Sequence, residues 1–567
     1  MTKYLKNHVS HRLLDTLDAL GNPIQNDTKY LASRMSLRKS SESQLGLALP
    51  LDCIHVAKSI DTLAVKEHVQ PDDIIKSVTI SKLQGKPNFV FQLDQSSFIK
   101  SVLGKTVANQ PYPSQLKRVL VEFSSPNIAK PIHVGHLRST IIGNYIANIH
   151  EWFGYDVMRL NYLGDWGTQY GLVKVGMKIL NPTEEELSQK PLSTLYQAYI
   201  SANAAAEKNP QILEEARKIF CNLERGESDD ISDWLLYKKY TVEELKKTYS
   251  RLNIVFDHYS WESDYKLDSI AYILDLLKTR GHLTTDKEGR SVASVDGKDV
   301  PVLKSDGTTL YLTRDIAAAV ERKSKFNFDT MYYLADTSQH KHFRNLFSIL
   351  KDLSFPWAEN IKHVRFGRVR GMSTRRGEVI FLNDILDEAY HLMIKQQQAS
   401  PNTKIDLLED KNTADILGVS TVIVADLIHK RMKDYSFNWD SAKSVKGNTG
   451  LRLQYTHCRL KSLSEKFCLP QGLEVEPSML PEPVAFDLIY QISRFEEVLD
   501  KSFEELEASR LTEYMFSLCD VINKAFMTLK VSNAGKVGEQ RLLLFEEARF
   551  VLYRGMKLLG LTPLNRM

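Results

Sequence analysis

The sequence predicts an α/β protein with a Rossmann-like parallel sheet in the middle of the chain, a small α+β domain before it and an all-α domain after it. Three observations lead to this fold class. A buried strand, a loop, a helix and a second strand follow one another between residues 119 and 163, as in a β-α-β unit of a doubly wound sheet. A hairpin-like alternation precedes this unit, and amphipathic helices fill the last part of the chain.

Residues 1–115 are expected to form the small α+β domain. The stretch VTISKLQGKPNFVFQLD has a turn signal at 85–87, after which Phe89, Phe91 and Leu93 stand at every second position as in a strand. The first residues, MTKYLKNHVSHRLLDTL, carry three basic side chains before the first acidic one, Asp15. This pattern is weakly similar to a short mitochondrial presequence, and an ordinary amphipathic helix explains it at least as well.

The central unit predicts where a ligand binds. VLVEFSS is an apolar run typical of a buried strand, and HLRSTIIGNYIANIHEWFG repeats apolar residues at helical spacing up to Gly154, a plausible cap. YDVMRLNYLGDWG gives the second strand. Ligands of doubly wound sheets bind outside the carboxyl ends of the strands, so the crevice is expected at the end of the first strand.

Four domains are expected in all. After the domain at 1–115, the sheet domain occupies 116–385 and contains a charged, helical insertion at about 180–295. DTMYYLAD and HVRFGRV are its further strands. Residues 386–440 are predicted to form a helical connection, and 441–567 an all-α domain.

Composition limits the class of protein. The 74 basic and 70 acidic residues give a net charge of +4, so a nucleic-acid surface has to be a local patch. The five cysteines lie far apart without a CxxC or Cys/His cluster, which argues against a zinc ribbon and a disulfide scaffold. No apolar run approaches the roughly 18 to 20 residues that span a bilayer.

The loop EFSSPNIAKPIHVGHLR carries His133 and His136, three residues apart. As metal ligands they would need further partners, and no Glu or Cys stands at ligand spacing. Two ordinary histidines at a helix start are a second possibility. The third is phosphate handling, because helix N-termini attract phosphate and imidazoles there can donate to charge that develops on a transferring phosphate. Gly135 would let an adenine ring approach the backbone because it has no Cβ.

HVGH resembles the HIGH signature of class I aminoacyl-tRNA synthetases. The longer stretch VEFSSPNIAKPIHVGHLRST, followed in order by NYLGDWGTQYG, SDGTTLYLTRDIAAA, GMSTRRGEVIFL, LQYTHCRL and GMKLLGLTP, resembles the arginyl-tRNA synthetase family from about residue 119 to the end. The resemblance implies a class I catalytic domain with an insertion, an amino-terminal domain that contacts the tRNA elbow and a helical anticodon-binding domain.

The activity implied by the resemblance is ATP-dependent conversion of L-arginine to arginyl-adenylate and transfer to tRNA(Arg). Mg²⁺ would come with ATP, no protein-bound metal cage or membrane is implied, and a monomer is expected. TRRG and QYTHCRL look slightly more like the mitochondrial branch, so the matrix is favoured over the cytoplasm. One alternative is a small-molecule nucleotidylyltransferase with HxGH, which leaves the helical carboxyl domain unexplained. The other is a non-catalytic tRNA-binding paralogue, although the motif residues it would be expected to lose are intact.

The resemblance also implies an arginine site. Asp315 lies four residues after Tyr311, so both are expected on one helix face, and a carboxylate can accept two parallel hydrogen bonds from a guanidinium. A neighbouring arginine is the alternative partner of Asp315. Glu122 would give a second carboxylate or a buried ion pair, and His340 and His342 are expected at the surface. The implied arginine-binding residues are Glu122, Ser125, Pro126, Asn127, His136, Tyr311, Asp315 and Gln339.

On the ATP side the sequence departs from the class pattern. KMSKS is replaced by GMSTR, with Thr374 at the position of the second lysine. In this family a lysine just before the HIGH motif is thought to take over, and Lys130 stands there. Arg376 is either a phosphate contact or part of a solvated turn. The implied catalytic residues are Lys130, His133 and His136, and the implied ATP-binding residues are His133, Gly135, His136, Met372, Ser373 and Arg375.

Residues 441–464 contain five basic side chains and no acidic one, with Tyr455 and His457 among them. Such a patch suits phosphate neutralisation and base stacking, and a charged helix face is the alternative. The family has its anticodon-binding domain here. The tRNA-binding candidates are Asn88, Phe89, Lys446, Arg452, Tyr455 and Arg459.

Overall fold

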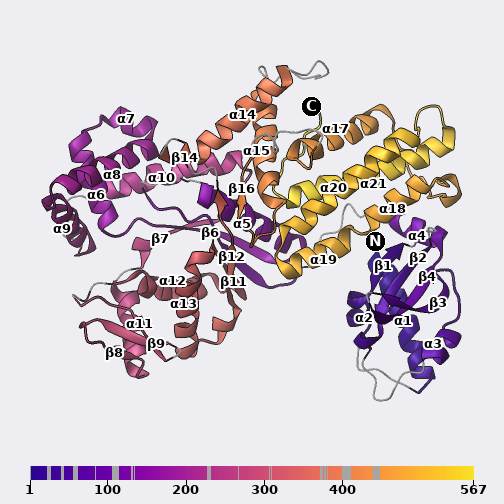
Figure 1. Cartoon of the computed structure of the whole chain (residues 1–567), viewed down its shortest axis with the longest axis horizontal. Helices are drawn as coiled ribbons and strands as arrows, with labels where there is room; N and C mark the ends of the chain where they lie inside the picture. Colours follow the sequence, from indigo (N-terminus) through magenta and orange to yellow (C-terminus); the bar gives the residue numbers. More distant parts are fainter. Residues whose placement is uncertain are drawn as a thin grey trace. The chain divides into compact units, whose positions relative to one another are not determined.

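The structure is a computed structural model. It describes residues 2–21, 27–39, 44–54, 62–83, 85–104, 114–128, 132, 134–225, 231–265, 267–295, 297–305, 307, 309–370, 374–375, 378–379, 381–398, 410–438 and 447–567. The chain forms two compact units (Figure 1). One contains Met1–Gln110, Leu451–Lys557 and Pro563–Met567, and the other contains Pro111–Gly450 and Leu558–Thr562.

A five-stranded, all-parallel sheet forms the centre of the second unit. Its strands are β5 (Arg118–Glu122), β6 (Asp156–Leu163), β7 (His258–Trp261), β11 (Thr330–Asp336) and β12 (Ile361–Phe366), in the spatial order β12-β11-β5-β6-β7. The predicted parallel sheet is therefore confirmed. The strand order reverses between β5 and β11, and a ligand crevice is expected at such a reversal, outside the carboxyl ends of the strands.

Helix α5 (Val134–Trp152) connects β5 to β6. It ends at Trp152, and the φ of 83° at Gly154 turns the chain so that the amide of Tyr155 donates to the carbonyl of His150 at 3.1 Å, so the predicted cap is confirmed. The helix lies against the strand end because Gly143 has no side chain. A Cβ at this position would stand 2.2 Å from the ring of Phe123.

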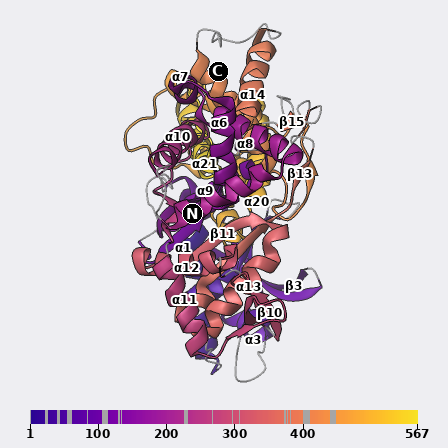
Figure 2. The same ribbon diagram turned by 90° about the vertical axis from the view of Figure 1, so that its left-hand side faces the viewer.

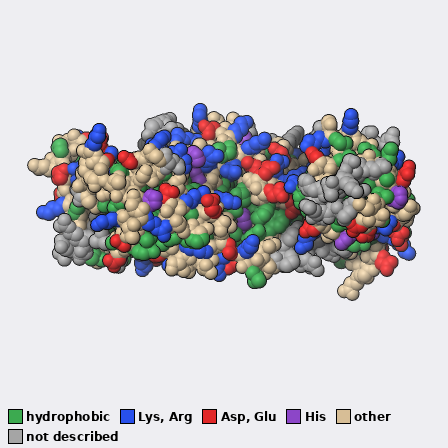
Figure 3. All heavy atoms as spheres, turned by 90° about the horizontal axis from the view of Figure 1, so that it is seen from below, with side chains coloured by type: hydrophobic (Ala, Val, Ile, Leu, Met, Phe, Trp, Pro, Cys, Tyr) green, Lys and Arg blue, Asp and Glu red, His purple; other side chains and the backbone are tan. Residues whose placement is uncertain are grey.

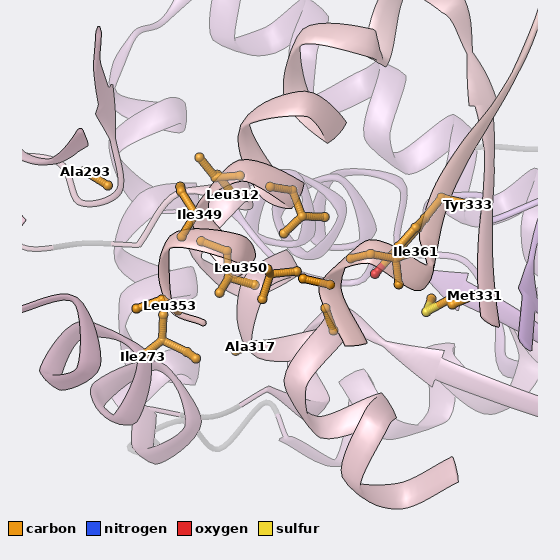
Figure 4. Close-up of a cluster of buried hydrophobic side chains, with 14 of the residues drawn as sticks. Ile273, Ala293, Leu312, Ala317, Met331, Tyr333, Ile349, Leu350, Leu353 and Ile361 are labelled. Carbon is orange, nitrogen blue, oxygen red and sulfur yellow. The ribbon is translucent and has the colours of Figure 1, made fainter. Parts of the chain in front are cut away.

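A second core fixes the two helices that follow the insertion. Buried side chains of α11 (Leu267–Thr279), α12 (Tyr311–Phe326) and α13 (His340–Asp352) pack against β9, β11 and β12. Figure 4 shows Leu312 and Ala317 from α12 near Ile349 and Leu350 from α13. This core sets where the first turns of α12 and α13 lie.

The insertion differs from the predicted all-helical segment. It contains α7 (Glu184–Gln189), α8 (Pro191–Lys208), α9 (Gln211–Arg225) and α10 (Ile231–Arg251). Helices α8 and α9 pack against α6 (Thr168–Leu180), which ends where the insertion begins (Figure 2). The edge strand β7 also falls in this range. A small antiparallel sheet of β8 (Leu283–Thr285), β9 (Ser291–Val295) and β10 (Lys298–Pro301) begins there too. These strands have three to five residues, too few for a clear period-2 pattern.

The second unit ends in helices and two short strand pairs. The helices are α14 (Leu382–Gln398) and α15 (Lys411–Leu427). The strand pairs are β13 (Val369–Arg370) with β16 (Tyr435–Ser436), and β14 (Thr374–Arg375) with β15 (Glu378–Val379). The pair β13 and β16 is parallel, so the chain entering the GMSTR segment runs alongside the chain that leaves α15.

The first unit joins the amino-terminal sheet to the carboxyl-terminal helices. Its amino-terminal elements are α1 (Thr2–Ala19), α2 (Thr28–Arg34), β1 (Ser36–Lys39), β2 (Leu45–Pro50), α3 (Thr62–His68), β3 (Ile75–Leu83), β4 (Lys86–Leu93) and α4 (Gln95–Leu103). The sheet is antiparallel with the order β1-β2-β4-β3, and β3 and β4 form the predicted hairpin.

The helices of this unit are α17 (Gly450–Lys466), α18 (Pro483–Ser493), α19 (Phe495–Glu505), α20 (Ala508–Thr528) and α21 (Gly535–Leu558). Phe98 on α4 packs edge-on against Phe486 on α18, with ring centroids 6.1 Å apart. Lys39 and Asp487 form an ion pair. Helix α1 buries its apolar side chains in the same unit, so the first residues of the chain form a structural helix.

Two further properties concern the charge of the surface and the hydropathy of the helices. Basic and acidic side chains are intermixed on the face seen in Figure 3, as the small net charge predicts. Within the part of the chain that the structure describes, no helix combines the length and the apolarity needed to cross a membrane.

The close approach of α5 to the end of β5 can be tested by replacing Gly143 with alanine. We expect Gly143→Ala to lower the stability of the fold by about 1 to 3 kcal/mol, because the added methyl group overlaps the Phe123 ring. The measurement is the midpoint of thermal unfolding. Phe123→Gly removes the Cβ, Cγ and Cδ2 atoms that the new methyl group meets, so the loss of stability in Gly143→Ala/Phe123→Gly should be smaller than the sum of the losses in the two single variants. Strictly additive effects would contradict the contact.

Candidate active site

A cavity of about 620 Å³ lies where β5, β11 and β12 end. Its walls come from the end of β5, the first turn of α5, one turn of α12, the end of β11, the start of α13 and the segment after β12. The lining residues are Glu122, Ser124, Ser125, Gly135, His136, Arg138, Ser139, Asp315, Leu334, Ala335, Asp336, Ser338, Gln339, His342, Phe343, Phe366, Gly367, Arg368 and Val369. The crevice therefore lies at the predicted end of the sheet.

The chain turns sharply as it leaves β5. Ser124 and Ser125 both have positive φ, 71° and 46°, a conformation that costs a side-chain-bearing residue free energy. Hydrogen bonds hold the turn. The Ser124 amide donates to Oγ of Ser139 (3.1 Å), its hydroxyl shares a hydrogen bond with the Tyr249 hydroxyl (2.7 Å), and the Ser125 amide donates to Oδ1 of Asn161 (3.1 Å). Strain of this kind is characteristic of functional sites.

The next residues form an anchored loop over the end of β6. Pro126 is buried, and Asn127 is exposed and pairs with Gly164 in a parallel bridge. The amide of Ile128 donates to the Gly164 carbonyl at 2.6 Å. A Cβ on Gly164 would stand 2.1 Å from Oδ1 of Asn127, so only glycine leaves room for this amide side chain.

Glu122 at the end of β5 forms a buried ion pair. Its Oε2 accepts from Nη1 of Arg322 on α12 at 3.0 Å, and its Oε1 accepts from the Ser125 hydroxyl at 2.9 Å. The guanidinium of Arg322 lies 4.4 Å from the ring centre of Tyr162. Burial raises the pKa of Glu122, and the charge of Arg322 opposes that rise. Glu122 thus has the buried partner that the sequence allowed, and it also lines the cavity.

Asp315 lines the cavity from the second turn of α12. Nε2 of His342 on α13 donates to its Oδ2 at 2.7 Å. The neighbouring arginines are engaged elsewhere, because Arg314 donates to the Thr309 hydroxyl and Arg322 pairs with Glu122. The expectation that His342 lies at the surface was wrong, since 26% of its side chain is exposed and its ring contacts Asp315. The packing of α13 on α12 places it there.

Tyr311 and Gln339 are exposed residues at the starts of α12 and α13. Tyr311, one turn before Asp315, has an exposure of 64%, and Gln339 precedes α13 and lines the cavity. His340 is exposed as expected.

A third carboxyl near Asp315 was not found from the sequence. Glu262 follows β7 in the 3-10 helix η3 (Glu262–Asp264). Burial, with a contribution from the negative charge of Asp315, raises its pKa to about 8. The acids of SWESD resemble many surface acids, and the preceding strand was itself predicted as helix, so the sequence contained no usable signal.

The first turn of α5 presents its residues to the cavity. Gly135 is exposed, His136 is partly buried, and the hydroxyl of Thr140 donates to the His136 carbonyl at 2.6 Å. Other predicted residues of the ATP side lie outside the described residues: Lys130, His133, Met372, Ser373 and Arg376. Thr374 and Arg375 are described only through their backbone in β14.

Arg138, one turn farther along α5, is a buried connection that the sequence analysis missed. Its guanidinium donates to the carbonyls of Gly367 (2.7 Å) and Lys433 (2.9 Å) and lies 3.3 Å from a carboxylate oxygen of Asp426. It therefore fixes α5 against both the chain that leaves β12 and the chain that follows α15. An arginine between Leu137 and Ser139 at the end of a motif gives no sign of such burial.

The RNA candidates in the amino-terminal sheet are buried. Phe89 has no exposed surface, and the Asn88 amide donates to the Lys86 carbonyl at 2.8 Å. Both side chains contribute to the core rather than to an exposed RNA contact. The place of Phe89 in the alternating pattern of the hairpin strand is explained by this burial.

On α17 the exposed candidates are grouped. Tyr455 is 44% exposed, and the guanidinium of Arg459 lies 5.7 Å from its ring centre and 4.2 Å from that of Phe526. Arg452 forms an ion pair with Asp520. His457 is buried and its Nδ1 bonds to the Leu564 carbonyl, whereas Lys446 lies outside the described residues.

Among the residues that the structure describes, no group of three His, Cys, Asp or Glu side chains has the arrangement of a metal site.

Comparison with known proteins gives two family matches. The family described as tRNA synthetases class I (R), catalytic domain, matches residues 98–439, and the DALR anticodon binding domain matches residues 453–567. The protein named probable arginine–tRNA ligase, mitochondrial, of Homo sapiens is 38% identical over 537 residues, covering 90% of this chain and 92% of that protein. The mitochondrial arginine–tRNA ligase of Saccharomyces cerevisiae is 39% identical, covering 92% of this chain and 84% of that enzyme.

Solved structures show the same fold. Arginyl-tRNA synthetase of Thermus thermophilus superposes with a TM-score of 0.80 at 21% identity, covering 99% of this chain and all of that one. The enzyme of Plasmodium falciparum gives a TM-score of 0.77 at 24% identity, with 99% of each chain covered.

The raised pKa of Glu262 predicts how stability depends on pH. Its ordinary value is 4.5 and its folded value is about 8, so between these values the folded chain keeps a proton that the unfolded chain releases. The free energy of unfolding therefore falls as pH rises through this window. We expect Glu262→Gln, which cannot ionise, to gain stability relative to the parent between pH 5 and pH 8.

Urea unfolding at pH 5, 6.5 and 8 measures this difference. Glu243→Gln, at an exposed position on α10, is the control and should follow the parent at each pH. A difference between Glu262→Gln and the parent that does not change with pH would contradict the raised pKa.

Proposed function

Because the chain belongs to the arginyl-tRNA synthetase family of class I aminoacyl-tRNA synthetases, we propose that it is an arginine–tRNA ligase that supplies arginyl-tRNA(Arg) for protein synthesis. The observation that carries the proposal is that residues of the HVGH helix and the carboxylate of Asp315 on α12 line one and the same cavity. The carboxylate of arginine attacks the α-phosphorus of ATP, and pyrophosphate leaves. A ribose hydroxyl at the tRNA end then attacks the arginyl carbonyl, and AMP leaves.

The arginine side chain is proposed to bind at the part of the cavity that carries Asp315 and Glu122. Asp315 accepts the guanidinium through two N–H···O bonds, a geometry that selects arginine over lysine. Tyr311, one turn away, covers the side chain, and Gln339 adds a polar contact. Glu122 contributes negative charge that Arg322 largely offsets.

The turned loop after β5 is proposed to hold the other end of the amino acid. Ser125, Pro126 and Asn127 form this loop, and the exposed amide of Asn127 suits the α-amino or carboxylate group. His136 stands between this loop and the phosphate side, since it lines the same cavity. The two ends of arginine are thus held about the α-carboxylate that reacts.

The phosphate side uses the start of α5 and the two neighbouring basic segments. His133 and His136 donate to the charge that develops on the α-phosphate, and Gly135 admits the adenine. Lys130 takes the role of the lysine that Thr374 replaces, and Arg375, with Met372 and Ser373, contacts ATP. No covalent enzyme intermediate is needed, so positioning and charge stabilisation supply the rate. Mg²⁺ enters as the ATP complex.

Tyr455 on α17 and three basic residues of the segment 441–464 are proposed to contact tRNA. Tyr455 offers an exposed ring for base stacking, and Arg459, Arg452 and Lys446 supply positive charge. The match of 453–567 to an anticodon-binding family supports this role. The amino-terminal sheet domain would contact the tRNA elbow through side chains other than the buried Asn88 and Phe89.

Three further properties complete the proposal. The chain acts as a monomer, within the four domains predicted at 1–115, 116–385, 386–440 and 441–567. Its compartment is the mitochondrial matrix, which the names of the human relative and of one yeast relative support. A cytoplasmic arginine–tRNA ligase of Saccharomyces cerevisiae is 38% identical over 468 residues, so the cytoplasm is the alternative.

Arginine-dependent exchange between ATP and radioactive pyrophosphate tests the activity. We expect exchange with arginine, measured with and without tRNA(Arg), and no exchange with lysine or citrulline at the same concentration. Transfer is measured as arginine bound to tRNA. If folded protein gives neither exchange nor charging with tRNA present, the proposed function is wrong.

Asp315→Asn tests the guanidinium contact. The amide keeps the size of the side chain and removes its charge, so we expect the KM for arginine to rise by at least about a hundredfold, as for a lost buried charge pair of about 3 kcal/mol. Binding of ATP should remain within about twofold. Glu321→Gln, a carboxyl on the same helix outside the cavity, is the control. An unchanged KM for arginine would remove Asp315 from this role.

A further inference from the structure

His342 is a cavity residue to which the proposed function gives no role. It comes from α13, and its Nε2 lies 2.7 Å from Oδ2 of Asp315 on α12. Both side chains are about three-quarters buried, with exposures of 26% and 23%. A carboxylate only accepts hydrogen bonds, so Nε2 of His342 carries the hydrogen.

We infer that His342 is a positioning residue for Asp315 in arginine binding. The hydrogen bond from its imidazole fixes the carboxylate toward the cavity. The inference rests on the proposed role of Asp315 as the acceptor of the arginine side chain.

The hydrogen bond leaves room for the substrate. A carboxylate has about four lone-pair positions, His342 uses one of them, and a guanidinium that binds side-on needs two. The contact therefore orients Asp315 without blocking it. A carboxylate that is already fixed loses less conformational entropy when arginine binds, which favours affinity.

Packing holds the imidazole in this position. The ring of His342 meets Phe343 edge-on at 5.4 Å, and Phe343 packs against Tyr333 (5.0 Å) and His363 (4.4 Å). Leu346, one turn farther along α13, is fully buried in the core shared with α12. The imidazole is thus supported from its own helix and from the sheet.

Two of the acids that line the cavity have partners of different kinds. Glu122 is paired with the guanidinium of Arg322, which is buried with it. Asp315 is hydrogen-bonded to an imidazole, which can donate a hydrogen bond without carrying a positive charge. The charge of Asp315 is therefore more available to the guanidinium of a ligand.

Other titratable groups surround this pair. Burial lowers the pKa of His363 on β12 to about 4, so this imidazole stays neutral between pH 6 and pH 8. Glu262 on η3 has a pKa of about 8 and titrates within it. The charged and titratable groups around the pair are Glu122, Glu262, Arg314, Arg322, Asp336, His340, His363 and Arg368. Because Glu262 titrates near pH 8, each His342 variant is compared with the parent protein at the same pH.

The experiment measures aminoacylation of tRNA(Arg) by the full chain between pH 6 and pH 8.5, with arginine and ATP varied separately. We expect His342→Leu to raise the KM for arginine about tenfold at pH 8, the effect of one lost hydrogen bond to a charged group. The KM for ATP should stay within about twofold. His342→Gln keeps a donor that cannot ionise, so it should restore most of the affinity at pH 8.

A control on the same helix separates the contact with Asp315 from a general change in α13. His340→Gln, at an exposed histidine, should leave the KM for arginine and the KM for ATP within about twofold of the parent.

Three results would overturn the inference. They are an arginine KM within twofold of the parent in His342→Leu, an arginine KM in His342→Gln as high as in His342→Leu, and equal changes of the KM for arginine and for ATP. If His342→Leu does not fold, His342→Phe, which keeps a ring and lacks the donor, takes its place. A parent protein without arginine-dependent charging would instead refute the proposed function itself.

Discussion

The buried ion pair between Glu122 and Arg322 is the contact on which the site depends most. It joins the last residue of β5, where the chain turns into the histidine loop, to the helix that carries Asp315. Both partners are almost fully buried. Removing either one would leave a buried charge without a partner, which typically costs 3 to 5 kcal/mol. The pair also brings the Ser125 hydroxyl to Glu122, so the strained turn, the strand end and α12 form one rigid wall.

Four acids lie at or near this cavity, and their charges are offset in different ways. Glu122 pairs with Arg322, Asp336 pairs with Arg368, Asp315 is hydrogen-bonded to an imidazole, and the pKa of Glu262 is raised to about 8. The net negative charge offered to a ligand is therefore close to that of one carboxylate at neutral pH. One effective negative charge matches a single guanidinium, and it avoids the repulsion that four ionised acids would create.

The sequence predicted the parts of this arrangement that depend on local pattern. The β-α-β unit, the Gly154 cap, the hairpin of β3 and β4 and the place of the crevice all follow from apolar periodicity and turn chemistry. It missed contacts set by packing between distant elements. Nothing near His342 shows that α13 will lie against α12, and nothing in HVGHLR shows that Arg138 will be buried against 367 and 433. The short strand before Glu262 was hidden among helices for the same reason.

The proposed replacement of the class lysine by Lys130 can be weighed against the described residues that flank the two segments. The amide of Leu382 donates to the carbonyl of Ile132 at 2.7 Å. Ile132 lies two residues after Lys130 in the chain, and Leu382 lies eight residues after Thr374. On the other side, Arg138 of α5 donates to the carbonyl of Gly367, four residues before Gly371. These hydrogen bonds tie the chain after GMSTR and the chain before it to residues next to HVGH, which supports the proposal that a lysine beside one motif can supply the charge missing from the other.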